Sequence, residues 1–135
     1  MTITKEQILE EANIYRSLTN DIADSWHKVL QWKHISQAEL SRRTGITERT
    51  VTTTISGQRI GTLDNVVLLC LAANLPSEMS EHLIRLSGHA IFLSNEDHII
   101  YNYLLRNKYS ESLSDIRQFL IDIGSELYIK FPADT

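Results

Sequence analysis

Four polar side chains near the middle of the chain have the types and the spacing needed to form hydrogen bonds with nucleic-acid bases. They are Glu48, Arg49, Thr52 and Thr53. On a helix, residues at this spacing share one face. A guanidinium can donate two parallel hydrogen bonds to guanine, a threonine offers both a hydroxyl and a methyl, and a carboxylate can accept from the amino group of cytosine. We predict that these four residues contact DNA bases, with Arg49 as the main reader.

A tight turn positions this helix against a shorter one before it. Residues 37–44 include good helix formers, and Gly45 can adopt the left-handed backbone conformation that ends a helix. Ile46 would fill the corner between the two helices. Thr47 has the short oxygen side chain that caps a new helix. The pattern predicts two short helices, one over residues 37–44 and one that begins at residue 48.

The second helix is expected to end near Gly57 and to bury one side. Val51 and Ile55 lie four residues apart, which turns both toward the core. Residues 52–54 are three consecutive threonines, and such β-branched residues lower helix propensity. Two interpretations of this run can hold together: the outward threonines read bases, or tertiary packing merely tolerates them.

The sequence of these two helices resembles a known DNA-binding family. The stretch from Ser36 to Gly45 follows the pattern Ser-Gln-x-Glu-Leu-Ala-x-x-x-Gly, and the second helix ends in Ser-Gly-Gln-Arg. Both are typical of phage-repressor-like (Cro/XRE-type) helix-turn-helix regulators, and the match spans about residues 26–75. Ser41 stands where the family usually has alanine, and Thr54 where a large apolar residue is usual. The resemblance implies a compact five-helix domain that binds DNA.

Three further residues are predicted to contact the DNA backbone. The resemblance implies this role for Gln37 at the start of the first helix, where free backbone N–H groups also attract phosphate. Arg43 and Arg59 would add positive charge to the same footprint. The alternative for each arginine, Arg49 included, is an ordinary solvated surface charge.

The formal charge of −4 is distributed unevenly along the chain. Residues 33–61 carry five basic and two acidic side chains, a balance of +3. Residues 1–32 have a balance of −2 and residues 62–135 a balance of −5. Because local positive charge drives phosphate binding, a basic segment within an acidic protein can still bind DNA.

The whole chain predicts an all-α protein in three parts. Apolar residues repeat at helical spacing, and no sustained alternation indicates strands. We expect an N-terminal helix within residues 1–20, the helix-turn-helix DNA-binding domain over residues 21–88, and a C-terminal helical extension over residues 89–135. The extension would be a helical hairpin that packs on the same core or pairs with a second subunit. Helix starts are expected at the capping residues Thr62, Ser77, Ser94 and Ser112.

Two apolar patterns indicate which helices build the core. Residues 63–73 are apolar nearly all round, which predicts a buried central helix. An amphipathic first helix is marked by Ile8, Leu9, Ala12 and Tyr15. Near the other end, Leu113, Ile116, Leu120 and Ile123 fall on one face of the last expected helix.

The composition argues against several other classes of protein. The 135 residues include one cysteine, Cys70, inside an apolar run, so we expect a buried thiol and no disulfide. The histidines lack metal-binding spacing, and no phosphate loop or serine nucleophile motif occurs. We expect no enzyme activity, no cofactor and no metal. Because the sequence has no membrane-spanning apolar run and no signal-like start, we expect a cytoplasmic protein without a membrane partner.

These patterns together predict a sequence-specific transcriptional regulator that binds double-stranded DNA. Dimers of such motifs place two recognition helices in successive major grooves about 34 Å apart. We therefore expect a homodimer and a DNA site with two-fold symmetry. The alternative function is a protein-interaction module on the same scaffold, such as an antitoxin-like or phage-defence partner. Regulation by a small molecule is compatible with both.

Overall fold

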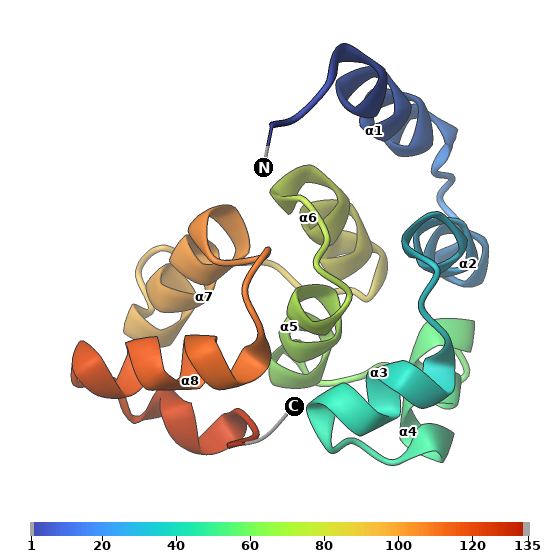
Figure 1. Ribbon diagram of the computed structural model, residues 1–135. Coiled ribbons are helices and arrows are strands. Elements are labelled where there is room, and N and C mark those ends of the chain that lie inside the picture. Colours follow the sequence, from blue (N-terminus) through green and yellow to red (C-terminus); the bar gives the residue numbers. More distant parts are fainter. Residues whose placement is uncertain (1, 134–135) are drawn as a thin grey trace.

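The computed structural model describes residues 2–133, and over that range every regular element is a helix (Figure 1). This confirms the all-α prediction. The described residues form eight α-helices and one short 3-10 helix, so the chain is larger than a five-helix unit. In order, the elements are α1 (Lys5–Ser17), α2 (Ile22–Lys33), α3 (Gln37–Thr44), α4 (Glu48–Ser56), α5 (Leu63–Ala72), α6 (Ser77–Leu86), α7 (Glu96–Asn107), α8 (Leu113–Asp122) and η1 (Glu126–Lys130).

Helix α5 is the centre of the protein, as its apolar sequence predicts. Every side chain from Val66 to Ala72 is buried. Helices α3, α6 and α7 all pack against α5, and α2 packs against α4 and α6 (Figure 1). Trp26 of α2 is fully buried in this core. Helix α3 therefore rests on α5, and α4 is held between α3 and α2.

The ends of α3 and α4 confirm the turn residues expected between them. Ser36 caps α3 by accepting a hydrogen bond from the backbone of Glu39 at 3.0 Å, and Thr47 caps α4 in the same way. Gly45 ends α3 with φ of 77°, and Gly57 ends α4 with φ of 80°. At Gly57 the packing is also close, because a Cβ atom there would lie 2.8 Å from Cγ2 of Ile22.

Two of the expected capping residues are wrong by one position. Helix α6 begins at Ser77 itself, and the residue before it, Pro76, makes no side-chain cap. Proline at the start leaves Ser77 in the first turn, where its N–H needs no partner within the helix. Helix α7 is capped by Asn95 and not by Ser94, since the Asn95 side chain accepts from the backbone of His98 at 3.2 Å. The cap of α8 is Ser112, as expected.

The first helix forms as expected but buries little. Thr4 and Gln7 make a reciprocal capping box at its start. The helix packs mainly on α2, and it has no fully buried residue: Ile8 is 53% exposed and Leu9 50%. Its apolar stripe is therefore only half covered by the described part of the chain.

The C-terminal hairpin packs on the same core as the rest of the protein. Helix α7 lies against α5 and α6, and Tyr101, Leu104 and Leu105 are buried there. On α8 the expected face is buried at Leu113, Ile116 and Leu120, whereas Ile123 lies just beyond the helix and is exposed. The hairpin therefore packs on the core of its own chain, and its pairing with a second subunit stays a prediction.

Polar contacts fasten the hairpin to the start of α5. Tyr101 of α7 donates a hydrogen bond to Asp64, and Lys130 of η1 lies 2.5 Å from the other oxygen of the same carboxylate. Burial opposes the ionisation of Asp64, but the hydrogen bonds from Lys130 and Tyr101 outweigh it and hold the pKa of this carboxyl below its usual value. Burial and the Asp64 charge both raise the pKa of Tyr101.

Cys70 is buried, as its apolar neighbours in the sequence predict. Cys70 is a fully buried free thiol, and burial raises its pKa to about 12. Such a thiol has neither the exposure nor the ionised form that reactivity needs.

Within residues 2–133, no helix combines the length and the apolar character required to cross a bilayer.

Candidate nucleic-acid interface

The outer face of α4 carries the four residues predicted to read bases. Glu48, Arg49 and Thr52 are exposed, and Thr53 is half-buried. The opposite face is buried through Val51, Thr54 and Ile55. Thr54 is buried, and Gly61 lies close to it: a Cβ atom added at Gly61 would be 2.9 Å from the methyl group of Thr54. The helix therefore presents the predicted residues on one surface.

Hydrogen bonds orient both outward threonines. The Thr52 hydroxyl donates to the side-chain oxygen of Gln37 at 2.8 Å, which ties α4 to the start of α3. The Thr53 hydroxyl donates to the backbone carbonyl of Thr50 at 3.1 Å. Each hydroxyl has thus used its one hydrogen atom, and what remains for a ligand is a methyl group and an acceptor lone pair. The amide N–H groups of Gln37 remain free donors within the described residues.

A polar groove of about 490 Å³ runs beside α4 and includes Arg59. Arg49 and Thr53 line one side of it, and the other side is formed by the loop after α4 and the start of α5. Seven groove residues were not among the predicted contacts, and the polar side chains among those that follow α4 are Gln58, Thr62 and Asn65. The position of Gln58 beside the helix-ending glycine was a usable signal in the sequence. Asn65 had none, because only the fold brings the start of α5 next to α4.

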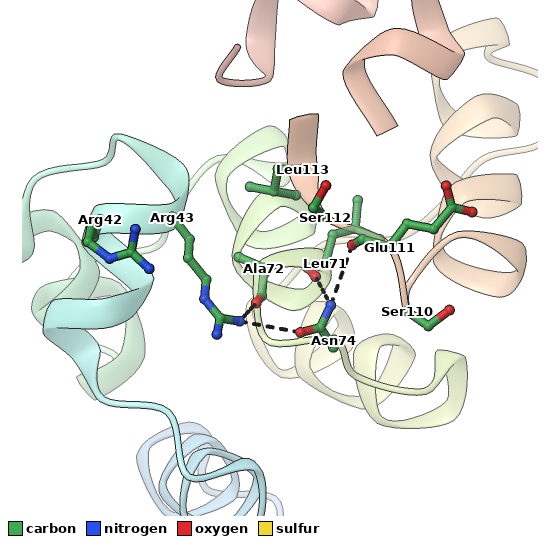
Figure 2. Close-up of a pocket in the computed structure, with 9 residues that line it drawn as sticks. All are labelled: Arg42, Arg43, Leu71, Ala72, Asn74, Ser110, Glu111, Ser112 and Leu113. Atoms are coloured by element: carbon green, nitrogen blue, oxygen red, sulfur yellow. Dashed lines mark hydrogen bonds between the residues drawn. The ribbon is translucent and has the colours of Figure 1, made fainter. Parts of the chain in front are cut away.

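Arg43 does not join this surface. Its guanidinium points toward the turn between α5 and α6, where it donates to the carbonyl oxygen of Ala72 at 2.7 Å and to Asn74 at 3.3 Å (Figure 2). The Asn74 amide in turn donates to the carbonyl oxygen of Tyr109 at 2.9 Å, in the loop before α8. In this structure Arg43 links α3 to two other parts of the protein.

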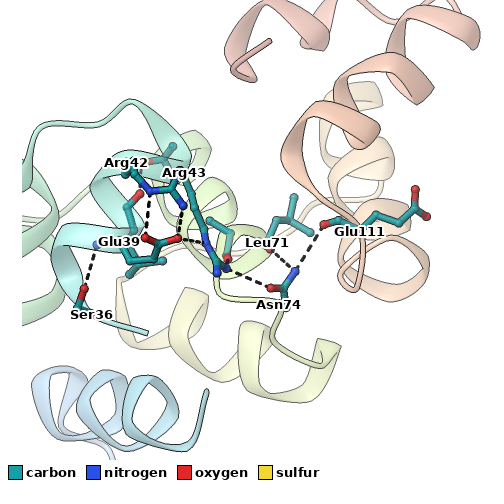
Figure 3. A network of polar contacts seen from close by, with 10 residues as sticks. Ser36, Glu39, Arg42, Arg43, Leu71, Asn74 and Glu111 are labelled. Carbon is teal, nitrogen blue, oxygen red and sulfur yellow. Dashed lines mark hydrogen bonds and ion pairs between the residues drawn. The ribbon is translucent and has the colours of Figure 1, made fainter. Parts of the chain in front are cut away.

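Glu39 holds both arginines of α3. Arg42 donates to it through Nε at 3.0 Å, and Arg43 donates to it at 2.8 Å (Figure 3). These contacts, that of Arg42 foremost, lower the pKa of Glu39 to about 2. Because two arginines share one carboxylate, this group adds only a single net positive charge.

The net positive charge beside α4 is consequently smaller than the +3 summed over residues 33–61. Arg49 and Arg59 take part in no ion pair within residues 2–133, and Glu48 is the acidic residue beside them on α4. Lys33 lies at the end of α2, with its ammonium 4.7 Å from the centre of the Trp32 ring. The free positive charge of this surface rests on two arginines, one on α4 and one on the loop that follows it.

His82 uses both of its ring nitrogens in hydrogen bonds within the protein. His82 donates to the carbonyl oxygen of Thr19 at 2.7 Å, and its second ring nitrogen faces Arg85 at 3.0 Å. Over residues 2–133, no three side chains of His, Cys, Asp or Glu are grouped closely enough to hold a metal ion. The polar surface of α4 and its groove is thus the best candidate site on the described part of the chain.

Comparison of the chain with family models, with curated proteins and with solved structures found no match.

Proposed function

We propose that the protein is a sequence-specific regulator of transcription that binds double-stranded DNA through α4. The supporting observation is the outer face of α4, where Arg49 and two oriented threonines stand on a helix whose other side is buried. In this proposal α2 to α6 are a phage-repressor-like five-helix domain, with α1 and the hairpin as additions. The proposed protein is cytoplasmic and performs no catalysis.

The side chains on α4 suggest which base edges they would recognise. Arg49 can donate two hydrogen bonds to the O6 and N7 atoms of guanine. Thr52 and Thr53 have committed their hydroxyl hydrogens, so they suit the methyl group of thymine or an amino group that donates to them. Gln37 and Arg59, on either side of α4, would bind backbone phosphates. Arg43 would act indirectly, by holding α3 in place.

We further propose that the protein binds DNA as a homodimer. One α4 contains nine residues and reads only a few base pairs. Two copies related by a two-fold axis would place their α4 helices in successive major grooves, about 34 Å apart. The expected DNA site is therefore an inverted repeat.

A second function is a protein-interaction module, antitoxin-like or a phage-defence partner. The modest free charge beside α4 favours it, because Glu39 has neutralised part of the basic segment. Such a module would tolerate the loss of Arg49 and Arg59 together, and its binding would depend little on salt. DNA binding depends steeply on salt through the release of counterions.

The deciding experiment is the selection of duplexes from a random-sequence library at near-physiological salt. The wild type, Arg49→Ala and the control Arg16→Ala, an exposed arginine on α1, are run in parallel. DNA reading predicts one enriched inverted repeat for the wild type and for Arg16→Ala, with the preference lost at a guanine position for Arg49→Ala. No enrichment by any of the three would overturn the proposal and point to a protein partner.

A further inference from the structure

A cavity of about 340 Å³ lies between α6, α7 and the segment that joins them, away from α4. Its apolar wall includes Ile84, Ile91 and Leu93, and the exposed arginines Arg85 and Arg106 also line it. Leu93 is 65% exposed, so part of this wall has no cover from the described residues. An apolar hollow with a few polar groups at its edge is typical of sites for small molecules.

The two arginines differ from those of α3 because neither forms a hydrogen bond with a carboxylate of the described residues. Arg85 uses one nitrogen to donate to His82 at 3.0 Å, which fixes the direction of its guanidinium. Arg106 lies 3.8 Å from Glu81, the acidic residue at this cavity, which is too far for a hydrogen bond. The cavity beside Arg43 in Figure 2 is unlike this one, because its arginines are already bound to Glu39.

We propose that the cavity between α6 and α7 binds a small organic carboxylate with an apolar body. The carboxylate would pair with Arg85 and Arg106, whose planar guanidinium groups match its two oxygens. The apolar body would lie on Ile91 and Leu93 and would cover the exposed surface of Leu93. Glu81 cancels one of the two positive charges, so the site takes an anion with a single negative charge.

One residue connects this cavity to the groove beside α4. His89 lines the cavity, and its Nε2 atom donates to the carbonyl oxygen of Gly61 at 2.5 Å. Gly61 also lines the polar groove that contains Arg49 and Arg59. A ligand that displaces His89 would therefore move the loop that carries Arg59. The ligand would act as an effector of DNA binding, and this consequence rests on the proposed function.

The ligand site is tested by titrating the ¹⁵N-labelled full chain with phenylacetate and hexanoate, using phenylacetamide as the uncharged match. We expect saturable shifts of the Ile91 and Leu93 backbone amides with both acids. Affinity would be about tenfold weaker for the amide, and similarly weaker for Arg106→Gln and Arg85→Gln but not for Arg16→Gln. The Arg106 side chain makes no hydrogen bond to any residue from 2 to 133, so its variant tests the site even where Arg85→Gln disturbs the fold through His82. Absent or scattered shifts, or equal binding of acid and amide, would overturn the proposal.

The effector role has a separate readout. The affinity for the selected duplex is measured by fluorescence anisotropy with and without phenylacetate, and we expect a change of about threefold or more. An unchanged DNA affinity at saturating phenylacetate would refute the route through His89. Failure of the protein to bind any duplex would refute the proposed function, while the titration would still decide whether the cavity is a ligand site.

Discussion

Replacing Arg43 with alanine distinguishes a structural arginine from one that binds DNA. The side chain is 30% exposed, and it donates to Glu39, to Asn74 and to the carbonyl oxygen of Ala72. The substitution would leave Asn74 and the carbonyl oxygen of Ala72 without this donor. A charged hydrogen bond lost in this way costs about 1 to 3 kcal/mol, and Arg42 still holds Glu39, so we expect Arg43→Ala to lower the free energy of unfolding by about 2 kcal/mol.

The matched control is Arg42→Ala. Arg42 pairs with the same carboxylate but is 60% exposed, so its loss is expected to lower the stability less than the loss of Arg43 does. Urea unfolding followed by circular dichroism measures both variants. A decrease in the midpoint for Arg43→Ala alone, with an unchanged slope, is the expected result.

The same variants separate stability from DNA binding. A residue that neutralises one phosphate contributes about 1 to the slope of log affinity against log salt. We expect Arg59→Ala to lower this slope by that amount and Arg43→Ala to leave it unchanged. The reasoning would be refuted if Arg43→Ala kept full stability and lowered the salt slope, because Arg43 would then be the phosphate contact that the sequence predicts.

The other predictions concern two helix-ending glycines and the ion pair of Asp64. Gly57→Ala places a side chain at a left-handed backbone position and within 2.8 Å of Ile22, so we expect a loss of about 2 to 3 kcal/mol in urea unfolding. Gly88→Ala is the control, because Gly88 also has a positive φ but has open space around it, and we expect it to lose about 1 kcal/mol. Equal losses for the two variants would show that the contact with Ile22 is unimportant. Asp64 has a pKa below its usual value in the folded protein, so its ion pair stabilises the protein above the unfolded pKa and is lost as pH falls through the folded one. We expect Asp64→Asn to flatten the stability profile below about pH 4 and to cost at most about 1 kcal/mol at neutral pH, and an unchanged acid limb would contradict this.

The pair of short helices α3 and α4 could be predicted closely because its signals are local. Gly45 and Gly57 end their helices, Thr47 caps the next one, and each acts within a few residues. The caps predicted for α6 and α7 were wrong because neighbouring residues can take the capping position. At α7 the side-chain oxygen of Asn95 accepts a hydrogen bond from the backbone N–H of His98, so the helix begins one residue later than a cap at Ser94 would give.

The environment of individual charges could not be predicted from the sequence. Arg43 contacts Ala72 and Asn74 because α3 packs near the end of α5. These residues are about thirty positions apart, so no local sequence pattern predicts the contact. For the same reason the charge of the basic segment overstated the charge beside α4. The charge summed over residues 33–61 does not say which cations Glu39 neutralises. In the fold its carboxylate pairs with Arg42 and Arg43, and the other cations are unaffected.

Asn74 shows how one residue can satisfy a backbone constraint and a bonding constraint together. Its φ of 55° lies in the region where glycine is the easiest residue and asparagine a tolerated one. Its amide faces an arginine donor on one side and carbonyl acceptors on the other, so it needs both an oxygen and an N–H group. Glycine would relax the backbone and disconnect α3 from the loop before α8, and aspartate would keep the first connection and repel the second. Asparagine meets all three demands, so this position links α3 to the loop that leads into α8.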